Sequence, residues 1–331
     1  MTLQVLAPGL LTTVQDGGRH GYQHLGVGPG GAMDPLAHRL ANALVGNGPG
    51  EATLEITLAG PVLVFGEETL VALCGADLSA TVDDRPLPLW RPVWVRAGAR
   101  LAFGAPRAGA RAYLALAGGL PLPLVLGSRS THLAAGFGGF QGRALRAGDL
   151  LPVPPQPRRC EGLLAALRRG AEPFAAPAWF AHGFQGEDRT LPFIPGPQWE
   201  ELTPASRTAF LEGTYRVAPA SNRMGLRLQG PALALARNRE RLSAPVAAGT
   251  LQLPPDGAPI LLMADRQTTG GYPRLGELAS VALPAAAQLR SPDPVRFVPV
   301  TAEAARAALL VRERQVAALT ATIQNHLEGP E

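Results

Sequence analysis

Residues 52–74 read ATLEITLAGPVLVFGEETLVALC and hold three short strand patterns in succession. Leu54–Leu58 alternates apolar and polar side chains, whereas Val62–Phe65 and Leu70–Leu73 are apolar runs bounded by turn residues. Alternation of period two predicts a half-buried strand, and short apolar runs between Gly or Pro predict buried strands. Similar patterns recur at 93–96, 100–103 and 111–117. Residues 52–151 are therefore predicted to fold as a small β-barrel or sandwich.

The second half of the chain repeats this organisation. The sequence ITLAGPVL at 56–63 resembles LRLQGPAL at 226–233, and each follows a polar segment that contains Gly and Met. The strand patterns of this half lie at 215–217, 226–228, 251–253, 260–263, 278–283 and 295–300. This internal similarity favours two similar β-rich lobes over one large sheet.

Helices are expected at few places. Asp34-Pro35 and Thr203-Pro204 each combine an N-cap residue with proline at the first helical position. They predict helices that end near Gly46 and Leu211, with His38 on the surface of the first one. A short helix is expected at 160–169 and a long one from Thr301 to about Leu327, whereas residues 7–33 are predicted to be loop-rich. The expected domains are an N-terminal lobe at 1–157, a connecting segment at 158–190, a C-terminal lobe at 191–300 and the helix at 301–328.

The composition excludes several classes of chemistry. All 30 basic residues of this 331-residue chain are arginine. The chain therefore cannot supply a Schiff-base lysine, a biotinyl-lysine or a phosphate-loop lysine. Its net charge of +4 is spread along the sequence, which argues against a nucleic-acid partner. No long apolar run and no basic, signal-like start are present, so we expect a cytoplasmic protein without a membrane partner.

The segment ADRQTTGGYPRLG at 264–276 is the first candidate for a binding loop. It follows the apolar run Ile260–Met263 and brings two charges, an amide, two hydroxyl groups and a Gly-Gly pair together. A buried strand that leads into such a turn is typical of ligand-binding loops, although a polar hairpin turn has the same composition. From these residues alone both interpretations stay open.

Three further polar, glycine-rich segments lie at 13–34, 127–140 and 221–225. His20 and His24 have the spacing of a helical metal site, but their glycine-rich segment is not expected to be helical, and no metal site is predicted. The loops instead offer Arg, Ser, Thr and Gln, with Asp16, Asp34 and Asp265 available for proton transfer. Arginine binds carboxylates with two hydrogen bonds, so a small polar substrate with a carboxylate or carbonyl group suits this set.

Six motifs in these segments resemble one family in both identity and order. They are TVQDGGR at 13–19, GAMD at 31–34, LGSRS at 126–130, FGGF at 137–140, RMG at 223–225 and DRQTTGGYP at 265–273. The chain resembles the KipA-like family, also called the allophanate hydrolase subunit 2 or biotin-dependent carboxyltransferase family. Its members include the C subunit of prokaryotic 5-oxoprolinase and half of the carboxyltransferase domain of urea carboxylase. Gly30 and Asn222 depart from the family pattern, in which we expect Ser and Asp at these positions.

The resemblance implies a mainly β fold with a few helices, in which two cyclophilin-like β-barrel lobes flank a ligand cleft. It implies one component of an enzyme complex that cleaves 5-oxoproline to L-glutamate, with two partners, a KipI-like protein and a LamB/YcsF-like protein. ATP, with Mg, would be consumed by the complex on a component that the sequence does not identify, and no biotin would be attached to this chain.

Site residues follow from residue type and motif membership. Asp265 and Asp16 are the candidates for proton transfer. Arg129, Arg223 or Arg266 would hold a carboxylate or phosphate, and Gln267, Thr268 and Thr269 the lactam. The full set of predicted substrate-binding residues is Arg19, Asp34, Arg129, Ser130, Arg223, Met224, Gln267, Thr268, Thr269, Gly270, Gly271 and Tyr272.

Two other functions remain open at this point. The chain could be a carboxyltransferase half that acts on urea or another small amide, with carboxybiotin supplied by a different protein. It could also be a regulatory partner that sequesters a KipI-like kinase inhibitor without turnover. A neighbouring biotin carboxylase gene would favour the first of these, and a LamB/YcsF neighbour would favour the 5-oxoprolinase.

Overall fold

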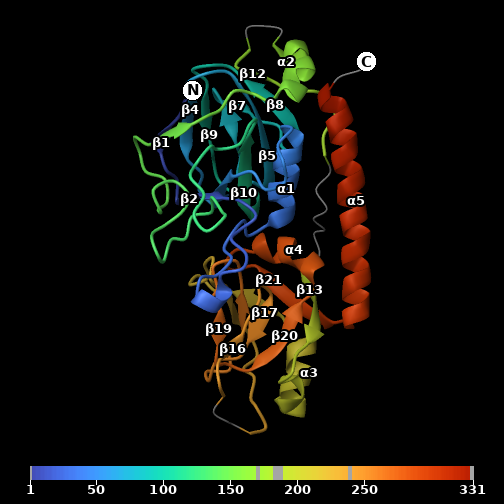
Figure 1. Ribbon diagram of the computed structural model, residues 1–331. Coiled ribbons are helices and arrows are strands. Elements are labelled where there is room, and N and C mark those ends of the chain that lie inside the picture. Colours follow the sequence, from blue (N-terminus) through green and yellow to red (C-terminus); the bar gives the residue numbers. More distant parts are fainter. Residues whose placement is uncertain (1, 169–171, 182–188, 238–240, 329–331) are drawn as a thin grey trace. The chain divides into compact units, whose positions relative to one another are not determined.

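The computed structural model describes residues 2–168, 172–181, 189–237 and 241–328. The chain folds into two compact units (Figure 1). Unit 1 comprises Met1–Arg19, Asp34–Phe184 and Val316–Glu331, and unit 2 comprises His20–Met33 and Gln185–Gln315. The mainly β fold with few helices is confirmed. The predicted lobe boundaries and the cleft stay predictions.

Unit 1 contains two six-stranded sheets whose neighbouring strands are antiparallel. The order of the first sheet is β11 (Leu150–Pro152), β1 (Thr2–Ala7), β4 (Val62–Phe65), β9 (Arg100–Ala102), β6 (Thr81–Val82) and β7 (Arg85–Pro86). The order of the second is β12 (Phe174–Ala175), β8 (Pro92–Val95), β5 (Thr69–Asp77), β10 (Ala108–Leu116), β3 (Thr53–Thr57) and β2 (Leu11–Gln15). Both sheets contribute side chains to one hydrophobic core.

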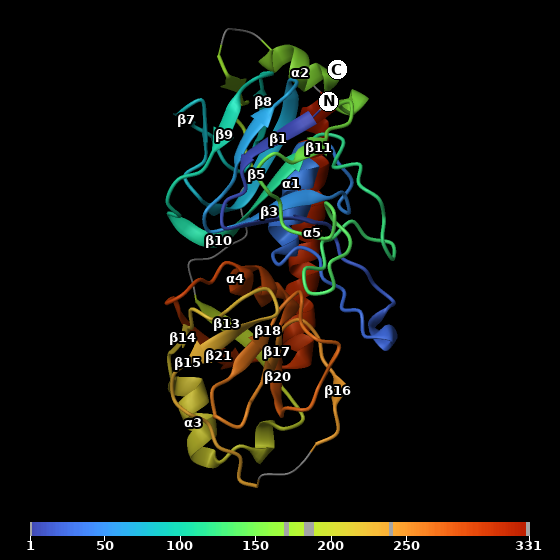
Figure 2. The ribbon, with the colours of Figure 1, turned by 90° about the vertical axis from the view of Figure 1, so that its left-hand side faces the viewer.

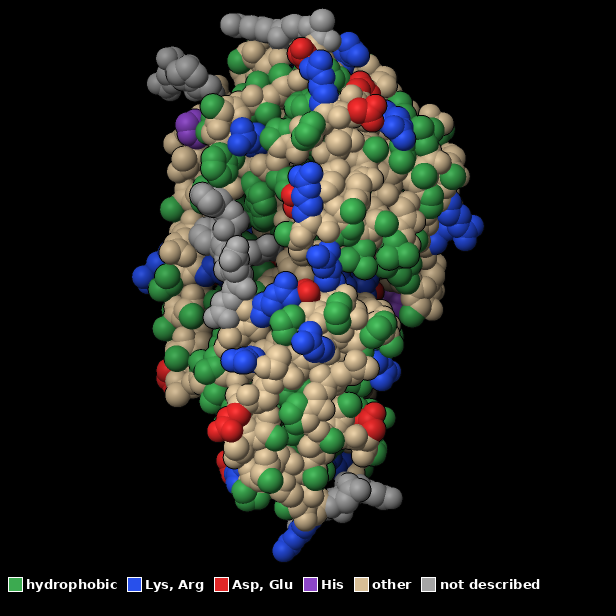
Figure 3. Space-filling model, turned by 180° about the vertical axis from the view of Figure 1, so that it is seen from behind, with side chains coloured by type: hydrophobic (Ala, Val, Ile, Leu, Met, Phe, Trp, Pro, Cys, Tyr) green, Lys and Arg blue, Asp and Glu red, His purple; other side chains and the backbone are tan. Residues whose placement is uncertain are grey.

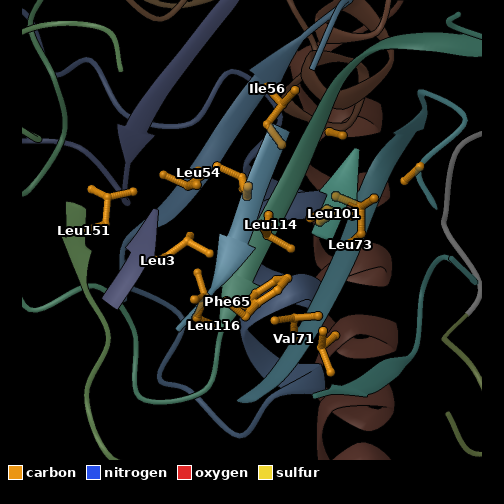
Figure 4. Close-up of a cluster of buried hydrophobic side chains, with 14 of the residues drawn as sticks. Leu3, Leu54, Ile56, Phe65, Val71, Leu73, Leu101, Leu114, Leu116 and Leu151 are labelled. Atoms are coloured by element: carbon orange, nitrogen blue, oxygen red, sulfur yellow. The ribbon is translucent and has the colours of Figure 1, made fainter. Parts of the chain in front are cut away.

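Figure 4 shows this core, where leucines from β1, β9 and β11 meet those of β3, β5 and β10. Strand β1 alternates in burial, because Leu3 and Val5 are buried and Gln4 is exposed. Strand β5 is buried along nearly its whole length, since helix α1 (Pro35–Leu44) packs on the sheet at β5 and β10. Coverage on both faces explains why Leu70–Leu73 is a continuous apolar run.

Helix α1 also contacts the end of the chain within unit 1. Its Leu36 and Leu40 form a small apolar cluster with Val316 of helix α5 (Ala302–Glu328). The long predicted helix is confirmed, and it has a single buried face in unit 1 formed by Val316, Ile323 and Leu327. Unit 1 also holds the short 3₁₀ helix η2 (Arg158–Cys160) and helix α2 (Glu161–Leu167), as predicted for 160–169.

Unit 2 is built on a closed seven-stranded barrel (Figure 2). Its order is β13 (Thr190–Pro195), β20 (Arg274–Leu278), β17 (Thr250–Gln252), β18 (Ile260–Leu262), β15 (Gly225–Gln229), β14 (Tyr215–Val217) and β21 (Pro294–Pro299). Strands β13 and β21 run parallel, which closes the barrel, and their other neighbours are antiparallel. Rings of Phe193, Phe210 and Phe297 pack together in its core.

Shorter elements complete unit 2. Strands β16 (Ala244–Pro245) and β19 (Thr269–Gly270) form a two-stranded sheet. Helix α3 (Pro204–Glu212) begins as predicted, because the Thr203 side chain accepts a hydrogen bond from the Ser206 N–H. The other helices are η1 (Gln23–Leu25), η3 (Trp199–Glu201), η4 (Ser280–Ala282) and α4 (Leu283–Ala287).

Three expectations from the sequence are wrong. The segment at 278–283 is not a strand, because β20 ends at Leu278 and η4 and α4 follow; Pro284 has no N–H for a ladder and the alanines after it favour helix. Residues 11–15 are not loop but strand β2, whose polar side chains are buried and bonded locally, as Gln15 Nε2 is to Thr13 Oγ1. His38 is not on the surface but 1% exposed, and its Nδ1 lies 3.0 Å from Thr53 Oγ1.

On the face shown in Figure 3, arginine side chains lie scattered among apolar and polar ones and do not gather into one basic patch. Within the part of the chain that the structure describes, every helix is too short or too polar to cross a bilayer.

Candidate functional site

The predicted site residues fall into two clusters, one in each unit. Unit 1 holds Asp16, Arg19, Asp34, Arg129 and Ser130. Unit 2 holds the remainder, namely Arg223, Met224, Asp265, Gln267, Thr268, Thr269, Gly270, Gly271 and Tyr272. Each cluster is described on its own.

In unit 1, Asp16 follows the end of β2 and forms hydrogen bonds with the loop at 127–131. Its Oδ1 accepts hydrogen bonds from Ser128 Oγ and Ser130 Oγ, each at 2.6 Å, and its Oδ2 accepts one from the Arg129 N–H at 2.5 Å. The Gly18 N–H donates to Oδ1 at 2.8 Å. Burial by itself would raise the pKa of the Asp16 carboxyl, but these hydrogen bonds outweigh it and lower the pKa below its usual value. A carboxylate held in this way is a weak base.

Arg19 also contacts the loop at 127–131. Its buried guanidinium donates to the Ser130 carbonyl and lies 4.8 Å from the centre of the Phe137 ring. Gly138 is required beside it, because its φ is +69° and a Cβ there would lie 2.2 Å from the Ser130 carbonyl oxygen. These contacts bring the motifs TVQDGGR and FGGF together in unit 1.

Arg129 and Asp34 also have internal partners. Arg129 Nε donates to the Leu122 carbonyl at 2.9 Å, and its Nη1 lies 3.6 Å from a Glu51 oxygen. Asp34 is the N-cap of α1, where its Oδ1 accepts from the N–H groups of Leu36 and Ala37. Each predicted residue of the unit 1 cluster thus contacts another part of the unit.

In unit 2, Arg223 and Asp265 form a bidentate ion pair. Arg223 Nε and Nη2 each lie 2.8 Å from an Asp265 oxygen, and Nη2 also donates to the Gly31 carbonyl at 2.7 Å. The Arg223 side chain is 4% exposed and that of Asp265 13%, so the pair is largely shielded from water. It joins three of the family motifs at one point of unit 2.

Arg266 is buried and contacts the backbone of its own unit. Its guanidinium contacts the backbone carbonyls of Val246, Met263 and Ala264 at 3.3–3.5 Å. Burial lowers the pKa of Arg266, an effect that Glu277 and Asp265 oppose. The three arginines expected to hold a carboxylate or phosphate are therefore all engaged within the protein.

A pocket of about 200 Å³ opens on the barrel of unit 2 between β15, β17, β18 and the 264–276 segment. Its lining is Ala220, Asn222, Met224, Gly225, Arg227, Gln252, Ile260, Leu262, Gln267 and Tyr272. Three predicted residues, Met224, Gln267 and Tyr272, are among them. Thr268, Thr269 and Gly270 lie outside the lining, because Thr269 and Gly270 pair with β16.

Gln252 lines this pocket but is not among the residues predicted from the sequence. It is 1% exposed; its Oε1 accepts from Gln267 Nε2 at 3.3 Å, and its Nε2 has no hydrogen-bond partner among the described residues. Gly270 makes room for it, since a Cβ at that position would lie 2.4 Å from Gln252 Nε2. Gln252 is the last residue of the fully buried strand β17, and the signal in the sequence was a polar residue between Leu251 and Leu253.

Arg227 is the second residue that was missed. It projects from β15 as an exposed side chain on the pocket lining, and within residues 2–168, 172–181, 189–237 and 241–328 its guanidinium has no acidic partner. The sequence gives little indication that Arg227 lines a pocket, because a single arginine on an alternating strand is ordinarily a solvated surface residue.

A second pocket of about 410 Å³ lies next to the first and shares Tyr272 with it. Leucines and prolines dominate its lining, including Leu233, Leu253 and Pro254, and Gly271 also contributes. Its charged residue, Arg241, is paired with Glu201. Within the described residues no group of three His, Cys, Asp or Glu side chains is arranged to hold a metal ion.

Comparison with known proteins gives consistent results along the whole chain. The model of the family "Carboxyltransferase domain, subdomain A and B" matches residues 25–299. The chain is 37% identical to the C subunit of 5-oxoprolinase from Escherichia coli strain K12 over 326 residues, which cover 98% of this chain and 99% of that one. It is 33% identical to the C subunit of 5-oxoprolinase from Haemophilus influenzae over 304 residues, with 92% of each chain covered.

A solved structure of the urea amidolyase of Kluyveromyces lactis superposes with a TM-score of 0.84 and 32% identity. The match covers 96% of this chain but 20% of that protein. This chain therefore corresponds to one portion of the larger protein.

Proposed function

Because the chain belongs to the carboxyltransferase-domain family, we propose that it acts as the C subunit of an ATP-dependent 5-oxoprolinase. The match to the E. coli protein supports this proposal most directly, since it covers 99% of that relative. The urea amidolyase match covers a fifth of its relative. The chain is also more similar in sequence to the E. coli protein, at 37% identity, than to the urea amidolyase, at 32%.

The proposed reaction opens the lactam of 5-oxoproline to give L-glutamate. The lactam is a stable amide, and phosphorylation of its carbonyl oxygen by ATP would activate the carbonyl carbon for attack by water. The chain has no lysine, so a phosphate-loop lysine for ATP would come from another protein of the complex. A KipI-like protein and a LamB/YcsF-like protein are the proposed partners.

In this proposal the pocket of unit 2 takes the small amide, because Gln267, Met224 and Tyr272 of two family motifs line it. We assign Asp16 and Asp265 positioning roles in place of proton transfer. Asp16 receives four hydrogen bonds from its own unit, and Asp265 is bound by Arg223 through both oxygens.

The test is reconstitution of the chain with the two partner proteins. We expect ATP-dependent release of L-glutamate from 5-oxoproline that disappears when this chain is omitted. Gln267→Met should lower kcat/KM, whereas Gln229→Met, on an exposed position of β15 outside the pocket, should not. Absence of glutamate release from the mixture of all three proteins would refute the proposal.

The high structural similarity to urea amidolyase supports a second candidate, transfer of carboxyl groups from carboxybiotin to urea or a similar amide. Biotin would then be carried by another protein, because this chain has no lysine to hold it. Carboxylation of urea in the presence of a biotinylated carrier and bicarbonate would identify this activity. Tight binding to a KipI-like protein without turnover of either substrate would instead indicate the regulatory function.

A further inference from the structure

We propose that the unit 2 pocket recognises the two ends of its substrate separately, with Gln252 on the lactam carbonyl and Arg227 on the carboxylate. The inference rests on the proposed function for the identity of the substrate, 5-oxoproline. Its structural basis is the unpartnered amide of Gln252 among the described residues and the position of both side chains on one pocket.

The side-chain amide of Gln252 has a hydrogen-bond donor that is not used within the described residues. Its Oε1 is occupied by Gln267, which fixes the orientation of the carboxamide, while the buried Nε2 lacks a partner in the described part of the chain. A buried N–H group without a partner costs free energy, and a ligand carbonyl would recover it. Gly270 leaves space for this amide, since a Cβ there would lie 2.4 Å from Nε2.

Gln267 complements this donor. Its Nε2 is used toward Gln252, which leaves Oε1 of an exposed side chain available as an acceptor at the pocket. The amide of a five-membered lactam is necessarily cis, so its C=O and N–H lie on the same edge of the ring. One donor and one acceptor on adjacent glutamines match that edge, which an extended trans peptide does not present.

Arg227 supplies the charge that the other arginines cannot. Arg223 is paired with Asp265, Arg266 is bound to backbone carbonyls, and Arg129 lies in unit 1. Arg227 lines the same pocket as Gln252 from the strand β15, and its exposed guanidinium has its hydrogen-bonding edge available for a carboxylate. The pocket would therefore favour an anionic lactam over an uncharged amide such as urea.

The test compares 5-oxoproline with 2-pyrrolidinone, which has the lactam but lacks the carboxylate. Dissociation constants of both are measured without ATP on the complex reconstituted from all three proteins. Gln252→Met should weaken the binding of both ligands about tenfold or more. Arg227→Gln should weaken 5-oxoproline about tenfold or more and leave 2-pyrrolidinone within about twofold of wild type.

Two control variants match these changes. Gln229→Met replaces an exposed glutamine on the same strand as Arg227, and Arg216→Gln replaces an exposed arginine on neighbouring β14. Both should bind each ligand as wild type does. Thermal unfolding verifies that Gln252→Met is folded. Should it not be, Gly270→Ala provides the second variant, because its methyl group displaces Gln252 Nε2 and should weaken both ligands equally.

Glutamate release with ATP, measured on the same preparations, separates the two proposals. Wild-type turnover together with unchanged binding in Gln252→Met and Gly270→Ala would overturn the inference and leave the proposed function intact. Equal effects of Arg227→Gln on both ligands would overturn the role of Arg227. Ligand binding with the expected pattern but no turnover would support the recognition of the lactam and refute the proposed function.

Discussion

At the scale of single residues, the charged groups of the family motifs have hydrogen-bond partners inside the protein. Arg223, Asp265 and Asp16 are strongly hydrogen-bonded within their own units. The motifs could be read from the sequence, but the roles of their members could not, because an ion pair and a substrate contact use the same residue types. Gln252 and Arg227 lie outside the motifs, and their common pocket depends on the pairing of β15 and β17 with β18.

Arg223→Gln is expected to destabilise unit 2 by about 3 kcal/mol, since removal of one partner leaves the Asp265 carboxylate largely buried without its counter-ion. Denaturant unfolding measures the change. Arg216→Gln, which removes an exposed arginine of the same unit, should have little effect. Similar stabilities for the two variants would contradict a structural role for the pair.

His38 gives a prediction about pH. Burial lowers its pKa from 6.5 to about 4, an effect that Asp16 and Glu55 oppose. Between these values the unfolded chain binds a proton that the folded one does not, so the free energy of unfolding falls as the pH falls from about 6.5 to about 4. The total loss from this residue is up to about 3 kcal/mol.

The measurement is denaturant unfolding at several pH values across this window. His38→Gln should show a flatter dependence, whereas His24→Gln, at an exposed position, should keep the wild-type slope. Parallel curves for His38→Gln and wild type would show that the buried imidazole does not set the acid sensitivity.

At the scale of elements, strand β5 could be predicted because its apolar run Leu70–Leu73 reflects its burial. Strands β3 and β4 were predicted as well, although β3 alternates in sequence and is almost wholly buried, and β4 is apolar in sequence but fully buried only at alternate positions. Strand β2 was not predicted, because its threonines and glutamine are polar although they are buried beside β3. The helix starts at Asp34 and Thr203 were predictable because capping is a local interaction.

The attachment of the 127–131 loop to β2 depends on Asp16. Asp16→Asn should cost about 1–3 kcal/mol, because an amide NH₂ replaces one of the two accepting oxygens. Faster amide hydrogen exchange at Arg129 and Gly18 should accompany the loss, since both N–H groups donate to this carboxylate. Asp256→Asn, on an exposed turn, is the control.

The Asp16 carboxylate should make the free energy of unfolding depend on pH below about pH 4, which is the lower end of the pH range in which His38 acts. Its pKa in the folded state is lowered, so its stabilising contribution is present above about pH 4 and is lost as the pH falls further. Unchanged exchange rates in Asp16→Asn would show that the loop is held by other contacts.

At the scale of the whole molecule, neither unit is a continuous piece of sequence. Residues 20–33 belong to unit 2 although residues on both sides of them belong to unit 1, and α5 begins in unit 2 and continues into unit 1. Local sequence patterns predicted α5 itself, but they hold no information on which unit each half joins. That assignment follows from long-range packing, such as Val316 against Leu36 and Leu40.

The unit 1 half of α5 should therefore be needed for the stability of unit 1. Ile323 and Leu327 are 2% and 0% exposed, and replacing both with alanine should cost about 4 kcal/mol or more. Hydrogen exchange resolved along the sequence should show the loss in unit 1 strands. Gln324→Ala, on the exposed face of the same helix, should leave exchange unchanged. A loss confined to unit 2 would contradict the assignment.

The shared helix also imposes an order on biosynthesis. Residues 316–328 leave the ribosome after every residue of unit 2, yet they cover part of unit 1, most of which was synthesised earlier. The folding of unit 1 therefore cannot be completed while the barrel is being translated, and Leu36 and Leu40 lack the cover of Val316 during this time. Domains generally fold as they emerge, the N-terminal one first. In this chain the first unit to begin folding is the last to be completed, so a nascent chain stalled before Val316 would present an apolar surface to chaperones.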